Sequence, residues 1–322
     1  MHALGPIDQA FLWLERRQQP MHVGGLMLFK IPENADANFV QEVAARFKAI
    51  TPPVRPFNQR LEGMFWEEDD EFDLEHHFRH IALPDPGRVR ELLAYVSQEH
   101  SALLDRAKPL WECHLIEGIE GNRFALYFKM HHAVVDGVAG MRIAQKSLST
   151  DPNEKALTPL WAVKRDKRPK EETTALSNFA DTLTRLRHQA SSVPKVAKEL
   201  YQAIRASYEK DPDYVSVFQA PRSILNQKVS GSRRFAAQSY DLTRIKAIGK
   251  KLGVTINDVV MAMCAGALRT YMLELNALPE KPLIAMVPMS LRRDDSDGGN
   301  QISMILANLG THLADPKARL DI

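Results

Sequence analysis

Residues 123–137 read RFALYFKMHHAVVDG, and this stretch decides the fold. Residues 123–130 are mostly aromatic and apolar, a composition that predicts a β-strand, and His131 and His132 follow directly. The apolar spacing over 138–148 then predicts a helix. A strand that ends in paired histidines brings at least one imidazole to the edge of a sheet, at the point where the chain turns.

Histidine chemistry makes this turn a candidate reactive site. An unperturbed imidazole titrates near pH 6.5, so its neutral form can accept a proton at working pH. Asp136 stands four residues after His132, where its carboxylate can point inward and pair with an arginine. Gly137 would permit a backbone angle or a close approach that a side chain forbids. The alternative is a polar strand end followed by an ordinary turn, but the complete HHxxxDG pattern favours a reactive histidine.

Metal binding is not predicted from the histidines or the cysteines. Adjacent histidines point apart on a strand or a helix, and no third ligand has suitable spacing. The histidines of HHFRH, residues 76–80, are expected on an extended surface segment within 72–83. Cys113 and Cys264 are too few for a disulfide scaffold and lack zinc spacing. This favours a reducing, cytoplasmic setting, with Cys113 a buried thiol.

The composition is that of an ordinary globular protein of about two domains. The chain has 322 residues, of which 44% are hydrophobic and 25% are charged. With 42 basic and 40 acidic residues the net charge is +2, which gives no support for nucleic-acid binding. No signal peptide is recognisable at the N-terminus. The most apolar stretch, 259–268, is too short to span a membrane and predicts a buried helix.

Strands and helices alternate along the chain, which predicts a mixed α/β fold. Further strands are expected at 22–31, 110–117, 231–242 and 282–288. Helices are expected at 4–17, 39–50, 88–104, 176–209 and 242–252, and from Asn257 onward. Prolines and a mixed charge run mark 150–175 as a linker. The expected organisation is therefore a first subdomain over 1–149, the linker, and a second part over 176–322 that begins with bridging helices.

Several motifs in a fixed order point to a family. HHxxxDG resembles the active-site motif of the coenzyme A-dependent acyltransferases, which include chloramphenicol acetyltransferases and peptide-synthetase condensation domains. The remaining blocks are similar to those of bacterial wax ester synthase/diacylglycerol acyltransferases. They are PMHVG at 20–24, PLW at 109–111, SILN at 223–226 with Gly231 and Arg233, NDVVMA at 257–262, and PMSLR at 288–292.

The resemblance implies a fold, a reaction and a set of site residues. The fold would be two chloramphenicol-acetyltransferase-like subdomains, with mixed sheets flanked by helices. The reaction would move a fatty acyl group from acyl-CoA to a long-chain alcohol or to diacylglycerol. His132 would be the general base beside His131, with no covalent acyl-enzyme and no cofactor besides the acyl-CoA co-substrate.

Other site residues follow from the same resemblance, each with a structural alternative. Asn257 is expected as an oxyanion donor or else as a helix cap, with Asp258 structural. Asp136 is expected to pair with Arg292, which could instead be a surface arginine. Pro109, Leu110 and Trp111 would wall the site behind His132, although Trp111 as plain core is equally consistent. Ala144, with the neighbouring small residues of its helix, would leave room for an acyl chain.

The implied lipid substrates raise the question of membrane contact. The predicted helices over 176–209 combine basic and apolar residues, which suits a peripheral lipid or lipid-droplet surface or, alternatively, a solvated bridging face. The resemblance also implies more chain after Ile322, so the second subdomain is expected to be incomplete without a C-terminal remainder. Two other functions stay open: an amide-forming condensation enzyme, and an inactive lipid-binding relative.

Overall fold

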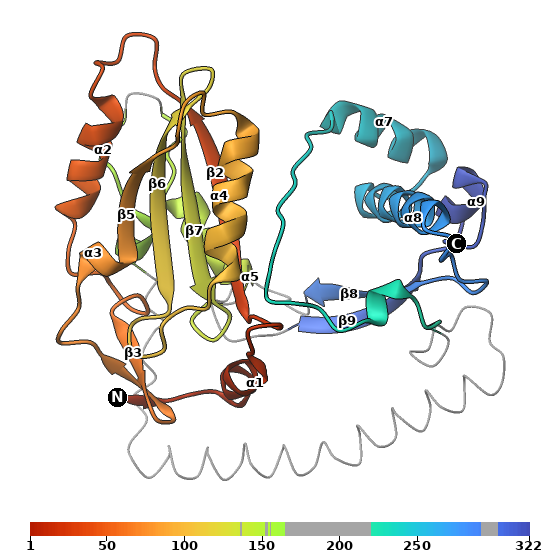
Figure 1. Cartoon of the computed structure of the whole chain (residues 1–322), viewed down its shortest axis with the longest axis horizontal. Helices are drawn as coiled ribbons and strands as arrows, with labels where there is room; N and C mark the ends of the chain where they lie inside the picture. Colours follow the sequence, from red (N-terminus) through yellow and green to blue (C-terminus); the bar gives the residue numbers. More distant parts are fainter. Residues whose placement is uncertain (136, 152–153, 155, 165–219, 291–301) are drawn as a thin grey trace. The chain divides into compact units, whose positions relative to one another are not determined.

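The computed structural model describes residues 1–135, 137–151, 154, 156–164, 220–290 and 302–322 (Figure 1). The chain forms two compact units. The first contains Met1–Asp166, Val229–Ala237 and Asp297–Asn300. The second contains Lys167–Lys228, Gln238–Ser296 and Gln301–Ile322. Each unit has its own sheet and helices, as the mixed α/β prediction requires.

The first unit is built on a four-stranded mixed sheet. Its strands are β2 (His22–Lys30), β7 (Arg123–His131), β6 (Trp111–Ile119) and β5 (Phe78–Ala82), in that order. β5 runs parallel to β6, and the other pairs are antiparallel. The strands predicted at 22–31, 110–117 and 123–130 are confirmed. The extended segment predicted at 72–83 instead contains a short helix, α3 (Leu74–His77), before β5; the side chain of Asp73 caps this helix by accepting a hydrogen bond from the N–H of Glu75.

Side-chain alternation along β7 divides the core of this unit into two layers. Phe124, Leu126, Phe128 and Met130 belong to the larger cluster, together with apolar residues of α2 (Phe39–Lys48). Ala125 and Tyr127 face the opposite side, in the cluster that contains the apolar stripe of α4 (Val89–Ser101). The sheet is thus covered on both faces, and the end of β7 is fixed between the two layers.

The first unit also contains a small sheet, two further helices and a 3₁₀ turn. A three-stranded sheet contains β1 (His2–Ala3), β4 (Phe65–Glu68) and β3 (Gln59–Glu62), in that order. Helix α1 (Pro6–Leu14) precedes β2, and helix α5 (Gly137–Lys146) follows β7. A 3₁₀ turn, η1 (Leu160–Ala162), contributes Trp161 to the larger core cluster, so the stretch 150–175 contains core residues of this unit.

The second unit contains helices α7 (Leu242–Leu252), α8 (Ile256–Glu274) and α9 (Pro316–Leu320), a hairpin of β8 (Ile284–Ser290) and β9 (Ile302–Asn308), and the 3₁₀ turn η3 (Ile224–Asn226). The strand predicted at 231–242 is wrong: residues 231–237 belong to the first unit and join none of the described sheets. The N–H of Arg233 donates to Ser101 Oγ and that of Phe235 to Ser97 Oγ, so α4 side chains satisfy this backbone.

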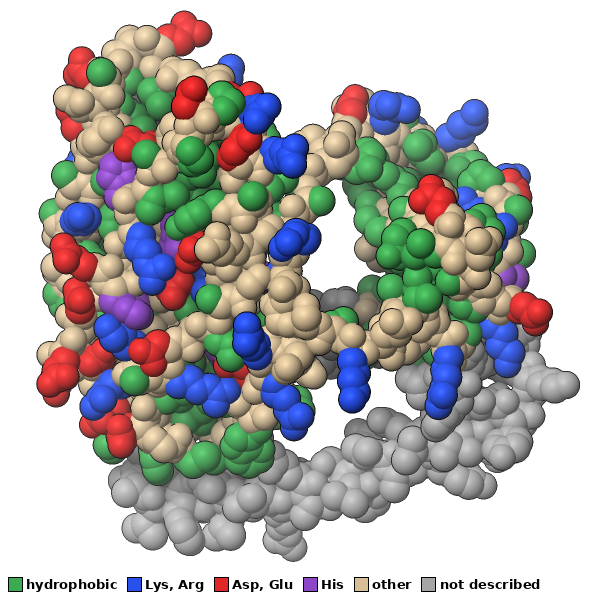
Figure 2. Space-filling model, viewed as in Figure 1, with side chains coloured by type: hydrophobic (Ala, Val, Ile, Leu, Met, Phe, Trp, Pro, Cys, Tyr) green, Lys and Arg blue, Asp and Glu red, His purple; other side chains and the backbone are tan. Residues whose placement is uncertain are grey.

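Helix α8 is less buried than its apolar sequence predicts. In the described part of the chain only Val259, Ala265 and Met272 of this helix are buried. Hydrophobic side chains lie at the surface of α7 and α8 (Figure 2). No single helix among the described residues is long and apolar enough to cross a bilayer; α7 and α8, bent by 104° at their junction, meet the length and composition criteria only as a pair.

Candidate active site

Three backbone hydrogen bonds hold the turn that carries the paired histidines. His131 is the last residue of β7, and its N–H donates to the carbonyl of Leu110 at 3.0 Å. The N–H of His132 donates to the carbonyl of Met21 at 2.9 Å. The N–H of Val134 donates to the backbone carbonyl of His131 at 3.0 Å. The turn is therefore tied to the entry of β6 and to the entry of β2.

The two imidazoles have different environments. His131 is fully buried, whereas His132 is half-buried. The Nδ1 atom of His131 accepts the N–H of Ala133 at 3.0 Å, which requires the proton of the neutral ring to be on Nε2. That Nε2 faces Glu15 Oε1 at 3.4 Å, a contact longer than an ordinary hydrogen bond. His131 is thus enclosed by protein, and of the two rings only that of His132 belongs to a partly exposed residue.

Glu15 is a charged residue buried directly behind the turn. Its side chain is only 2% exposed, and it accepts the N–H of Met21 at 3.1 Å and a bond from Arg106 Nη2 at 3.1 Å. Burial alone would raise the pKa of this carboxyl. The contacts with His131, the Met21 N–H and Arg106 outweigh burial and lower the pKa of Glu15 to about 2. Glu15 is therefore a carboxylate at neutral pH.

Phe11 of α1 orients the ring of His132. The two rings stack with their centroids 5.0 Å apart and an interplanar angle of 18°. A cavity of about 360 Å³ lies beside the turn, and its lining includes Ala133 and Val134 together with Arg55 and Trp66. The N-terminal helix and the small sheet thus shape the surroundings of the paired histidines.

The PLW segment supports the turn from the core. Trp111 is fully buried, stacks on Trp161 at 5.4 Å and donates from Nε1 to the carbonyl of Phe57. It is a core residue, as its structural alternative predicted. Pro109 and Leu110 are buried as well, and the Leu110 carbonyl is the one that receives the His131 N–H. The PLW segment therefore supports the histidine turn through its backbone.

Gly137 and Ala144 both lie on α5. The expectation that Gly137 needs a special backbone angle or a close approach is wrong: it has no positive φ, and a Cβ there would meet no described atom within 4 Å. Ala144 is half-buried and packs on the larger core cluster. One turn later, Leu148 lines an apolar cavity of about 180 Å³ that Phe124 and Trp161 also line.

Asn257 and Asp258 lie on α8, in the second unit. Thr255, and not Asn257, caps this helix: its hydroxyl accepts the N–H of Asp258, whose carboxylate in turn accepts the N–H of Thr255. The structural role expected for Asp258 is thus a capping box. Asn257 is exposed among the described residues. Asp136 and Arg292 lie outside the described residues, as do the helices predicted over 176–209.

The histidines at 76–80 are not a surface group. His77 is 1% exposed, stacks between Phe72 and Trp111, and hydrogen-bonds through Nδ1 to the Trp111 carbonyl at 2.8 Å. Burial lowers the pKa of His77 to about 4, so the ring is neutral at pH 7. The short helix α3 turns His77 inward. Because a continuous extended segment was expected here, the burial of His77 was not predicted.

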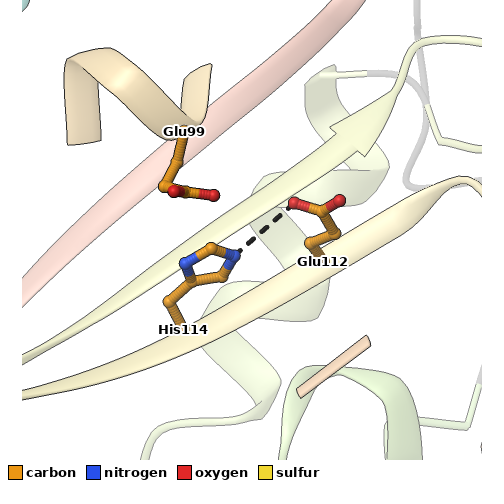
Figure 3. A group of neighbouring side chains, drawn as sticks. All are labelled: Glu99, Glu112 and His114. Atoms are coloured by element: carbon orange, nitrogen blue, oxygen red, sulfur yellow. Dashed lines mark ion pairs between the residues drawn. The ribbon is translucent and has the colours of Figure 1, made fainter. Parts of the chain in front are cut away.

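A buried polar cluster lies between the sheet and α4 (Figure 3). Glu99, Glu112 and His114 offer ligand atoms within 4.8 Å of one another, which is compatible with a metal ion. The ammonium of Lys129, however, lies 3.1 Å from Glu112 Oε2 and also donates to the carbonyls of Glu99 and Ala102. A buried ammonium already balances the Glu112 charge, so the cluster is accounted for as an ion pair that ties α4 to the sheet.

Solved structures define the class of the fold. The first condensation domain of the calcium-dependent antibiotic synthetase superposes over 99% of this chain and 72% of its own, with a TM-score of 0.52 at 13% identity. Such low identity shows the fold alone. The chain thus shares the fold of a condensation domain, with the paired histidines at the end of β7.

Closer similarities identify the family. The profile of the wax ester synthase/diacylglycerol acyltransferase catalytic domain matches residues 4–260. The chain is 60% identical to O-acyltransferase WSD of Acinetobacter baylyi, covering all of this chain and 70% of that protein. It is 45% identical to the probable diacylglycerol O-acyltransferase tgs2 of Mycobacterium tuberculosis, covering 99% and 71%.

A solved family member agrees with these matches. The wax ester synthase/diacylglycerol acyltransferase from Marinobacter aquaeolei superposes over 99% of this chain and 69% of its own, with a TM-score of 0.75 at 47% identity. The chain belongs to the wax ester synthase/diacylglycerol acyltransferase family and is an O-acyltransferase.

Proposed function

We propose that this protein transfers a fatty acyl group from acyl-CoA to a long-chain alcohol, to diacylglycerol or to both, with His132 as general base. The observation that carries the proposal is the contrast within the histidine pair: His131 is fully buried and His132 is half-buried in a turn fixed at both ends. Family membership supplies the reaction class.

One histidine is sufficient for the proton transfers of this reaction. His132 takes the proton of the acceptor hydroxyl. The oxygen of that hydroxyl attacks the thioester carbonyl carbon, and the C–O bond forms. The tetrahedral oxyanion collapses, the C–S bond breaks, and His132 returns the proton to the departing thiolate. General base catalysis contributes roughly 100- to 10,000-fold, so positioning and oxyanion stabilisation must supply the remaining acceleration. The route needs no covalent acyl-enzyme, and we propose no metal or further cofactor.

Further residues enter the proposal at defined points. Asn257 is the proposed oxyanion donor, because its amide is not consumed by the cap of α8, which Thr255 provides. Asp136 and Arg292 are proposed to pair and so to hold the histidine turn. Ala144 is proposed to limit acyl-chain length, since it lies on α5 one turn before Leu148 in the wall of the apolar cavity.

Contact with lipid is the second part of the proposal. The acceptors are insoluble, and the predicted helices over 176–209 combine basic with apolar residues, a pattern suited to peripheral contact with an anionic lipid surface in the cytoplasm. Sedimentation of the protein with phosphatidylglycerol vesicles, compared with phosphatidylcholine vesicles, tests this part. Equal partitioning to both, or to neither, would contradict it.

Full activity is proposed to need additional polypeptide, corresponding to the part of the relatives beyond the 70% of O-acyltransferase WSD that this chain spans. The support is the apolar surface of the second unit, since large exposed patches mark interaction surfaces. Its exposed residues include Leu242, Ile248, Leu252, Ile256, Val260, Met263, Tyr271, Leu273, Leu275, Met286 and Ile305. Co-expression with the corresponding segment of O-acyltransferase WSD should raise activity and reduce binding of a hydrophobic dye.

The acceptor class is tested by CoA release from palmitoyl-CoA. The protein, alone and with that co-expressed segment, is offered hexadecanol, dipalmitoylglycerol or hexadecylamine. Release with the alcohol or the diacylglycerol, with the ester identified by mass spectrometry, supports the proposal. Release with the amine alone would favour the condensation-type alternative. Lipid binding without release in either preparation would favour the inactive lipid-binding alternative.

A further inference from the structure

Glu15 contacts both the histidine turn and Met21, the residue before β2 to which the turn is tied. One of its oxygens, Oε1, faces His131 Nε2 at 3.4 Å and accepts the N–H of Met21 at 3.1 Å. The carbonyl of the same Met21 accepts the N–H of His132 at 2.9 Å. A single carboxylate is thus connected to both histidines, to one through the ring and to the other through the backbone.

The contact with His131 selects one form of the imidazole. A neutral imidazole has one N–H and one bare nitrogen. If the proton of His131 were on Nδ1 instead of Nε2, the N–H of Ala133 would face the N–H of the ring and have no acceptor. A carboxylate beside Nε2 favours the form that carries its proton there, as a buried aspartate does for the histidine of a catalytic triad. In this form Nδ1 accepts the Ala133 N–H, one residue after His132.

The charge of Glu15 is maintained by its surroundings. Arg106 Nη2 donates to Oε2 at 3.1 Å and to the carbonyl of Leu12 at 2.6 Å, so the guanidinium also ties α1 to this point. The side chain of Glu15 is 2% exposed, and its lowered pKa agrees with a permanent carboxylate. Glu15, the residue after α1, therefore places a buried negative charge beside the Nε2 atom of His131 and the N–H of Met21.

We propose that Glu15 is a positioning residue: it holds His131 as the Nε2-protonated tautomer and anchors Met21, and through these two contacts it fixes the backbone that presents His132 to substrate. Glu15 touches no reacting atom. The kinetic consequence rests on the proposed function of His132, whereas the tautomer of His131 does not. The two ideas can therefore fail separately.

The first test is the tautomer itself, measured by ¹⁵N–¹H correlation spectra of the imidazoles at pH 7 in the full chain. His131, assigned by the signal missing from His131→Asn, should show a protonated Nε2 and a bare Nδ1. In Glu15→Gln the amide can face the ring with either its oxygen or its NH₂, so the second tautomer should become populated. A protonated Nδ1 in the wild type would overturn the proposal, even if the variant fails to fold.

The second test separates positioning from binding. In Glu15→Gln, kcat should fall about 10- to 100-fold, as when other residues that orient a histidine are removed. KM for acyl-CoA should change by no more than about twofold, because ground-state binding is untouched. Glu33→Gln, an exposed position, is the matched control and should retain full kcat. A folded Glu15→Gln variant with wild-type kcat, or with lost kcat but an unchanged His131 tautomer, contradicts the proposal.

Discussion

His131 and His132 are chemically identical neighbours, and the contacts that each ring makes separate their roles. The ring of His131 accepts a backbone N–H and faces a carboxylate, so it is committed to the structure of the turn. The ring of His132 stacks on Phe11 at the half-buried end of the turn. A general base must reach the proton that it removes, and this requirement favours His132.

Ala144 gives a prediction about acyl-chain length. Ala144→Phe adds an aromatic ring on α5 one turn before the apolar cavity at Leu148, and this volume should exclude the end of a long chain. The ratio of kcat/KM for lauroyl-CoA over palmitoyl-CoA should therefore rise by about tenfold, a discrimination of the size that a few methylenes can provide. Ala144→Ser is the control. An unchanged chain-length profile in Ala144→Phe would count against this role.

Single residues also mark the limit of what the sequence could predict. The pattern HHxxxDG identified the turn because its signal is local. Glu15 was not recognised, because its partners His131 and Arg106 are 116 and 91 residues away in the chain and only the folded sheet brings them together. Trp111 could be core or wall until the stacking on Trp161 was seen. A lone acidic residue after an apolar helix is the only sequence signal for Glu15.

At the scale of elements, α8 begins with a reciprocal cap whose energy can be measured. Thr255→Ala removes the hydroxyl that accepts the Asp258 N–H, which should destabilise the first turn by about 1 kcal/mol. The Asp258 amide should then exchange its hydrogen roughly fivefold faster. Thr255→Ser retains the hydroxyl and should protect this amide as the wild type does. Equal protection in Thr255→Ala would show that the cap contributes nothing.

Two buried histidines give the first unit a pH-dependent stability. Burial lowers the pKa of His22 and of His77 to about 4, against about 6.5 in an unfolded chain. The unfolded chain therefore binds more protons between these values, so stability is fully present above pH 6.5 and falls as the pH decreases toward 4. The midpoint of thermal unfolding should decrease steadily over this interval.

His77→Gln tests the source of this dependence. The substitution removes one of the two titrating rings, so the midpoint of unfolding should fall less steeply between pH 6.5 and pH 4. Each such group changes the free energy of unfolding by at most about 1.4 kcal/mol per pH unit. His312→Gln alters an exposed ring and serves as the control. The same steep fall in His77→Gln as in the control would contradict the assignment.

Helices and strands that pack one apolar face on the core could be predicted from the sequence. Strands β2, β6 and β7 and helices α2, α4 and α7 were predicted within a few residues, because each has a clear apolar period. The strand predicted at 231–242 failed because alternation alone does not supply a pairing partner. Its backbone is satisfied by Ser97 and Ser101 of α4, side chains that a strand pattern does not reveal.

At the scale of the whole molecule, the order of motifs was more informative than any single motif. The blocks in their fixed order predicted the acyltransferase fold and family, and both are confirmed by the comparisons. The arrangement of catalytic groups from distant parts of the chain was not predictable in the same way. It depends on how the sheets pack, and the sequence around Asn257 contains no information about its distance from His132.

The central claim is that His132 is the base of an ester-forming reaction, and one assay addresses it directly. CoA release from palmitoyl-CoA with hexadecanol is compared among the wild type, His132→Ala and the exposed-histidine control His312→Ala, under the conditions in which the wild type is active. The account predicts a loss of roughly 100-fold or more in kcat for His132→Ala, with an unchanged unfolding midpoint, and wild-type activity in the control. Ester formation by folded His132→Ala at the wild-type rate would contradict it.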